Sequence, residues 1–133
     1  MIDCENEVYT RVEEALKKQF PKIEVSGTYV DSPTSFPFVT IEQTDSYPIE
    51  DLQDGSGKEN FVMAVFTVNA YSNKASTKKS ECKKIMAFVG DLLYRMNFIR
   101  TAQTPMSNTQ NSKIYRIVAT YRVVTDGKHF YRR

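Results

Sequence analysis

Apolar residues follow a helical period near the N-terminus of the chain. Four of them recur every fourth residue, on one side of a stretch whose other side is rich in Glu and Lys; they are Val8, Val12, Leu16 and Phe20. This spacing predicts an amphipathic helix of about four turns. We expect Asp3 to cap its N-terminus and Pro21 to end it.

After Pro21 the apolar period changes to two, which is the period of a strand. Residues 23–27 predict a short strand, and Phe38 to Thr44 predict a second one, which Pro33 and Pro37 precede as a loop leading into an edge strand. Asn60 to Tyr71 form the strongest strand pattern, with apolar residues on both faces in its first half. A strand of that kind is expected in the centre of a sheet or covered on both sides.

A second helical pattern covers residues 76–97. Its apolar positions fall three and four residues apart; they are Cys82, Ile85, Met86, Val89, Leu92, Leu93 and Met96. Gly90 stands inside this helix, where glycine costs about 1 kcal/mol relative to alanine. We therefore expect another segment of backbone to pack closely against Gly90.

The C-terminal part of the chain predicts a β-hairpin. Phe98 to Thr104 and Lys113 to Thr125 alternate as strands, and residues 105–112 between them form a polar loop. Residues 45–59 have no apolar period and predict a second long loop, of a length that is usually functional or disordered. Residues 127–133 are expected to form a flexible tail or a last short strand.

These elements predict a single α+β domain over residues 1–133, in the order α-β-β-β-α-β-β. The hairpin connections and the presence of only two helices favour a mainly antiparallel, twisted sheet with both helices packed on one face. A chain of 133 residues that is 41% hydrophobic and 26% charged has enough apolar material for one core of this kind.

Candidate catalytic and metal-binding residues are scarce. With one His and two Cys the chain cannot supply the four Cys or His ligands of a structural zinc site. His129 is the only imidazole and lies in the C-terminal tail, and Cys4 and Cys82 share no spacing motif, so we expect two free thiols with Cys82 buried on the apolar side of its helix. The sequence predicts no enzyme activity, no metal and no cofactor. The acidic N-terminus indicates no signal peptide, and no apolar stretch predicts a membrane span.

Nucleic-acid binding is a weaker alternative. The chain has 8 Tyr and 8 Phe, which would allow bases to stack on a sheet surface. The candidates on the last long strand are divided, however, because Tyr115 and Tyr121 fall on one face while Arg116 and Arg122 fall on the other. A small nucleic-acid-binding domain is therefore the less favoured hypothesis.

The net charge of +2 is the sum of an acidic middle and a basic end. Residues 42–59 contain six acids and one base, whereas residues 113–133 contain six bases and one acid. Opposite patches on one molecule favour head-to-tail association, which closes into rings, although a solvated surface with no partner is equally compatible with the charges. We therefore treat as a hypothetical interface the residues Glu50, Asp51, Asp54, Glu59, Lys78, Lys79, Lys83, Arg116, Arg122, Arg132 and Arg133.

Three strings of the sequence are similar to those of a known family. They are FPFVTIEQTDS at residues 36–46, FTVNAYSNKASTKKSECKK at residues 66–84 and IYRIVATYRVV at residues 114–124, the last followed by FYRR at residues 130–133. The chain resembles the tail terminator or tail completion proteins of long-tailed phages and prophages of Gram-positive bacteria.

The resemblance implies a non-enzymatic virion protein of the head–tail neck, assembled in the cytoplasm of the host bacterium. Such a protein forms a ring, expected to be a hexamer, that caps the tail tube and docks on the head-side connector. Its partners are further copies of itself, the major tail tube protein and the connector, with only transient DNA contact and no membrane. A head-closure or connector protein of the same neck is the alternative.

Overall fold

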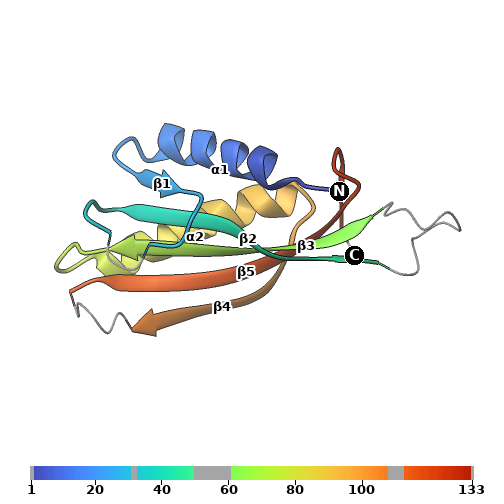
Figure 1. Cartoon of the computed structure of the whole chain (residues 1–133). Coiled ribbons are helices and arrows are strands. Elements are labelled where there is room, and N and C mark those ends of the chain that lie inside the picture. The colour runs from blue at the N-terminus through green and yellow to red at the C-terminus, as the bar shows by residue number, and fades with distance from the viewer. Residues whose placement is uncertain (1, 31–32, 50–60, 108–112, 133) are drawn as a thin grey trace, which may run out of the picture.

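The computed structural model describes residues 2–30, 33–49, 61–107 and 113–132, and in it two helices lie on one face of a six-stranded sheet (Figure 1). The helices are α1 (Glu5–Gln19) and α2 (Lys78–Arg95). The strands are β1 (Glu24–Ser26), β2 (Phe38–Pro48), β3 (Val62–Ser72), β4 (Ile99–Ser107), β5 (Tyr115–Thr125) and β6 (Phe130–Tyr131).

The order of the strands across the sheet is β1-β2-β3-β5-β4, and β6 pairs with the end of β5. The β1–β2 pair is parallel and the other pairs are antiparallel. The predicted α+β fold and the order α-β-β-β-α-β-β are thus confirmed, with β6 as one further short strand. β3 is central, as its two apolar faces predicted.

The core lies between the helices and the sheet. α1 contributes Val8, Val12 and Leu16, all buried, and the apolar positions of α2 pack opposite alternate residues of β3 and β5. The rings of Phe66 and Phe98 meet edge to face there, 5.6 Å apart. The helical spacing of the sequence therefore identified the buried sides of both helices.

The N-cap of α1 is Cys4, so the prediction that Asp3 occupies this position is wrong by one residue. The carboxylate of Asp3 nevertheless accepts a hydrogen bond from the backbone amide of Glu5 at 3.0 Å. Asp3 therefore satisfies one of the free amides at the helix start from just outside the helix.

Two predicted loops begin too early, because both flanking strands continue. β2 extends through Pro48 and its last four residues pair with Val62–Val65, after a register shift between Gln43 and Asp45. β4 extends through Ser107, with Pro105 opposite Ile117. Residues 45–48 and 105–106 are exposed, so burial imposes no apolar alternation on them. The remainder of each predicted loop, residues 50–59 and 108–112, lies outside the described residues.

Gly90 faces a side chain, not the backbone that the sequence led us to expect. A Cβ atom at this position would stand 3.2 Å from the hydroxyl oxygen of Tyr121 on β5. Glycine thus lets the tyrosine hydroxyl reach the backbone of α2.

The C-terminal segment folds back on the sheet. β6 places Phe130 opposite Thr125 and Tyr131 opposite Val124, and the ring of Phe130 lies 5.9 Å from that of Phe98. The short-strand alternative is therefore confirmed for Phe130 and Tyr131.

Candidate interaction surface

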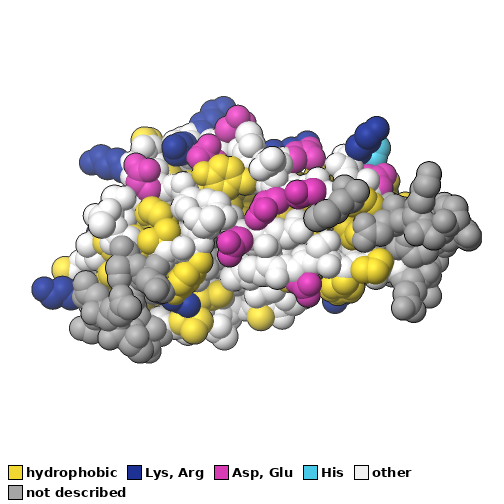
Figure 2. Space-filling model, in the orientation of Figure 1, with side chains coloured by type: hydrophobic (Ala, Val, Ile, Leu, Met, Phe, Trp, Pro, Cys, Tyr) yellow, Lys and Arg dark blue, Asp and Glu magenta, His cyan; other side chains and the backbone are white. Residues whose placement is uncertain are grey.

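No helix of the described chain covers the second face of the sheet. From Met63 to Thr67 of β3 and from Arg116 to Arg122 of β5, the residues that alternate with the buried ones point to this face and are half-buried. We call it the open face and define it by Glu42, Asp45, Met63, Val65, Thr67, Arg116, Val118, Thr120 and Arg122. In Figure 2, white surface, which is backbone and side chains that are neither hydrophobic nor charged, lies between hydrophobic groups toward the left and right of the view.

Charge is ordered across the sheet from one edge to the other. β1 and β2 carry only acids (Glu24, Glu42 and Asp45), and β3 carries no charged residue. β5 and β4 carry only bases, which are Arg116, Arg122 and Arg100. The sheet therefore has an acidic side and a basic side with a neutral strand between them.

One row of the open face contains both signs of charge. Asp45 on β2 and Arg122 on β5 each pair with Val65 of β3, so they stand two strands apart. At about 4.8 Å per strand their backbones are about 10 Å apart. The acid and the base thus belong to the same row of the open face, on opposite sides of the neutral strand β3.

One end of the open face is closed by the segment before β2. The Arg116 guanidinium donates to the Tyr29 hydroxyl at 2.8 Å and to the Met106 sulfur at 3.4 Å. It also lies over the rings of Tyr29 and Tyr71, at 5.4 and 5.9 Å. Arg116 is therefore fixed in place, and Tyr29 and Met106 beside it are exposed.

The predicted interface residues lie on several surfaces. Lys78, Lys79 and Lys83 are on the exposed side of α2, in the helix layer, whereas Arg116 and Arg122 point from the opposite face of the sheet. Arg132 lies against the C-terminal end of α2, with its guanidinium 4.0 Å from the centre of the Tyr94 ring. The residues outside the described part of the chain are Glu50, Asp51, Asp54, Glu59 and Arg133.

At the start of α2 the positive charge is partly balanced. Lys74 forms an ion pair with Glu81 at 2.8 Å, and the Ser72 hydroxyl donates to the same carboxylate at 2.6 Å. Burial raises the pKa of Glu81, but the hydrogen bonds from Lys74 and Ser72 outweigh it and hold the pKa below its usual value. Glu81 is therefore a structural carboxylate.

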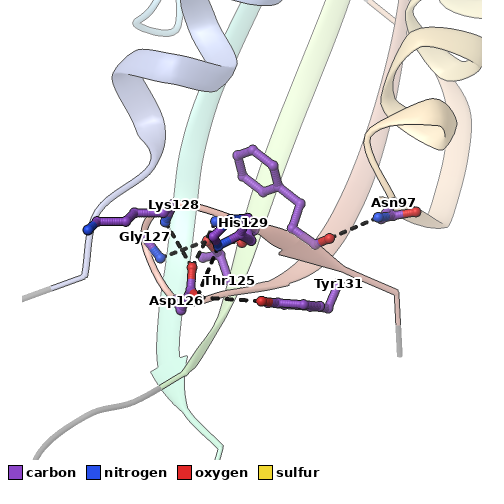
Figure 3. Close-up of polar contacts among 8 residues, drawn as sticks. Asn97, Thr125, Asp126, Gly127, Lys128, His129 and Tyr131 are labelled. Carbon is purple, nitrogen blue, oxygen red and sulfur yellow. Dashed lines mark hydrogen bonds and ion pairs between the residues drawn. The ribbon is translucent and has the colours of Figure 1, made fainter.

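The single histidine belongs to an ordered turn between β5 and β6 (Figure 3). One oxygen of Asp126 accepts the backbone amides of Lys128 and His129, at 2.9 and 2.7 Å. These hydrogen bonds lower the pKa of Asp126 to about 2. The other oxygen faces the His129 ring at 3.4 Å and the Tyr131 hydroxyl at 3.5 Å.

This turn is held from outside as well. The Asn97 side chain donates to the Phe130 carbonyl at 2.8 Å, and the Thr125 hydroxyl donates to the His129 carbonyl at 2.8 Å. Asn97 ends α2 with a positive φ of 72°, a conformation that asparagine tolerates. The Asp126–His129 pair therefore stabilises a turn, and among the described residues no Ser or Cys contacts it.

Both thiols are free and buried. Burial raises the pKa of Cys4 to about 11 and that of Cys82 to about 12, with nearby carboxylates adding to the effect. A nucleophilic cysteine needs the opposite shift. Within the described ranges no three His, Cys, Asp or Glu residues are placed to hold a metal ion.

The division of aromatic and basic residues on β5 is as predicted. Tyr121 is buried and Tyr115 half-buried on the helix side, where both pack with the core, while Arg116 and Arg122 point to the open face. The tyrosines are thus not available for stacking against bases beside the arginines.

Sequence reasoning missed a hollow between α2 and the start of β4. Its volume is about 460 Å³, and Gly90, Arg100 and Tyr121 are among its lining residues. The Tyr121 hydroxyl, on a residue only 2% exposed, has no hydrogen-bond partner among the described residues. An unpaired buried hydroxyl costs about 1–3 kcal/mol of stability. The only sign of this hollow in the sequence was the glycine in the middle of the helix.

In comparisons with known proteins, no family model and no curated protein matches the chain. None of the helices in the described residues has the length and apolar character that crossing a membrane requires.

Proposed function

We propose that this chain is a non-enzymatic structural subunit that associates head-to-tail with copies of itself into a ring. The observation that carries the proposal is the order of charge across the sheet, acidic on β1 and β2 and basic on β5 and β4. Side-by-side subunits in one orientation bring the acidic side of each to the basic side of the next. A contact between two different surfaces of the same chain closes into a ring when the rotation is right.

The ring is proposed to serve as the tail terminator of a long-tailed phage. In this role it caps the tail tube, receives the head-side connector on its other end and contacts DNA only in passage. The resemblance of residues 36–46, 66–84 and 114–124 to that family supports the assignment. A head-closure or connector protein of the same neck is the alternative, because it would use the same kind of ring.

Charge reversal in one row of the open face tests the ring. Asp45→Lys and Arg122→Glu each place like charges across the contact, and we expect each to weaken assembly at least tenfold by sedimentation and native mass spectrometry. The double variant restores opposite charges in exchanged positions and should regain assembly. Higher salt should weaken the wild-type ring as well, because exposed charges are screened.

Matched controls separate this contact from net charge. Glu14→Lys and Lys18→Glu change the charge by the same amounts at exposed positions of α1, and both should leave assembly unchanged. A chain that is monomeric at high micromolar concentration, or a double variant no better than the singles, would overturn the proposal.

The position of the ring within the phage neck is tested by adding purified tail tube protein or purified connector protein. A tail terminator should bind the ends of tubes in electron micrographs, whereas a head-closure protein should bind the connector alone. Salt-sensitive binding of DNA by a monomer would favour the nucleic-acid-binding alternative instead.

A further inference from the structure

The hollow between α2 and β4 is a built pocket at the edge of the sheet. Its walls come from the C-terminal half of α2, the start of β4 and the middle of β5. The lining residues are Met86, Ala87, Gly90, Asp91, Tyr94, Phe98, Arg100 and Tyr121. Apolar walls with a few convergent polar groups are typical of binding sites.

The polar groups of this pocket include both hydrogen-bond donors and a hydrogen-bond acceptor. The Tyr121 hydroxyl has no partner in the described residues, and it can donate a hydrogen bond. The Arg100 guanidinium donates to the Gln103 side chain at 3.1 Å and has further N–H groups. Asp91 on α2 supplies a carboxylate that accepts.

The strand beside the pocket is the edge of the sheet. β4 pairs with β5 on one side, and no described strand pairs with its other side. Residues 100–106 are all exposed. An edge of this kind presents free backbone groups to another chain, and a pocket next to it selects one side chain of the strand that is added.

We propose that β4 accepts an extended segment of a partner protein as an additional strand, and that a glutamine of this segment enters the pocket. The carboxamide oxygen accepts from Tyr121 and Arg100, and the carboxamide nitrogen donates to Asp91. The two methylene groups pack against Met86 and Phe98. Both signs of charge line the pocket, so a group that donates and accepts satisfies Arg100 and Asp91 together. A lysine offers no acceptor to Arg100, and a glutamate offers no donor to Asp91.

The Tyr121 hydroxyl is reached by a small movement. Its oxygen is shielded from solvent and lies beside the backbone of Gly90. Met86 lines the same pocket, and its unbranched side chain can rotate to let the carboxamide in.

Part of the β2 edge is not available as the added strand from a second copy. β1 already pairs with residues 38–40 of β2, and Glu5 occupies the backbone amide of Gln43. The pocket lies on the helix side of the sheet, whereas Asp45 and Arg122 of the proposed ring contact lie on the open face. Because β4 is also the edge of the basic side of the sheet, an added strand would compete with side-by-side assembly, and the test below therefore reads binding at β4 and not assembly.

The test uses the full chain and two synthetic peptides, acetyl-TVQVT-amide and acetyl-TVAVT-amide. The glutamine peptide should shift the amide NMR signals of residues 99–107 and bind about fivefold more tightly than the alanine peptide, which is the effect of one hydrogen bond. Equal binding of the two peptides, or shifts confined to other strands, would overturn the proposal.

Two variants locate the glutamine. Tyr121→Phe should remove the preference for it while keeping a midpoint of thermal unfolding at or above that of the wild type, because it deletes an unpaired hydroxyl. Ala87→Leu, at an exposed position of α2 that lines the pocket, should fill the pocket and also remove the preference. A Tyr121→Phe protein that unfolds at a lower temperature would show that the hydroxyl has a partner within the fold, and the proposal would fail.

Discussion

The carboxylate of Glu5 accepts a hydrogen bond from the backbone amide of Gln43, with an oxygen–nitrogen distance of 2.9 Å. Glu5 is in the first turn of α1, and Gln43 lies on β2 beyond Thr40, the last of its residues that pairs with β1. An amide at an exposed strand edge otherwise binds water or another chain. The contact therefore ties α1 to the sheet and occupies one donor of the β2 edge.

Replacing Glu5 tests this contact. We expect Glu5→Ala to lower the free energy of unfolding by about 1–2 kcal/mol, since hydrogen bonds to charged groups contribute about 1.5–3 kcal/mol and this one is partly exposed. Urea denaturation measures the change. Glu7→Ala is the matched control, because Glu7 is in the same helical turn but pairs with Arg11 on the surface, which contributes at most about 1 kcal/mol. Equal losses in the two variants would mean that the bond to Gln43 adds no stability.

The Asp126 turn predicts acid sensitivity. The pKa of Asp126 is about 2 in the folded chain against an ordinary value of 3.8. A lowered pKa stabilises the fold above the ordinary value, and that contribution is lost as the pH falls from about 4 through 2. Asp126→Asn should therefore be less stable than the wild type at pH 6, and the difference should shrink as the pH approaches 2. A constant difference in unfolding midpoint over this range would contradict the assignment.

Helices and strands were predictable where one of their sides is buried, because burial makes the apolar residues recur at a regular spacing. Val8, Val12 and Leu16 recur at the helical spacing because one side of α1 faces the core. One apolar face of β3 likewise packs in the core, whereas its second apolar face lies on the open face, which no described helix covers. The ends of β2 and β4 were missed because their residues are exposed, so nothing in the sequence requires them to alternate. Backbone pairing with the buried strands β3 and β5 holds those ends in place.

The candidate interaction surface was predictable in part. The separation of acids and bases along the chain was visible, but their order across the sheet depends on β5 lying between β3 and β4, which the sequence does not state. The pocket at Tyr121 depends on three elements meeting. Gly90 gave a sign of close approach, but a glycine does not reveal whether backbone or a hydroxyl approaches it.

The buried thiols give a chemical test of the core. Cys4 and Cys82 are 3% and 0% exposed, and their pKa values are raised to about 11 and about 12. Neither should react measurably with a thiol reagent such as Ellman's reagent at pH 8 in the folded protein, and both should react at once in concentrated urea. Rapid labelling of one thiol without denaturant would show that its part of the core opens.

Gly90 and Tyr121 predict a strongly non-additive pair of substitutions. Gly90→Ala gains about 1 kcal/mol of helix propensity, but its Cβ would lie 3.2 Å from the Tyr121 oxygen. That contact is tighter than van der Waals packing prefers, so the single variant should be close to the wild type in stability. In a Tyr121→Phe background the oxygen is gone, and the same substitution should stabilise the fold by about 1 kcal/mol. A double-mutant cycle by urea denaturation measures the coupling between the two positions. Additive effects would mean that the hydroxyl does not lie against this turn of α2.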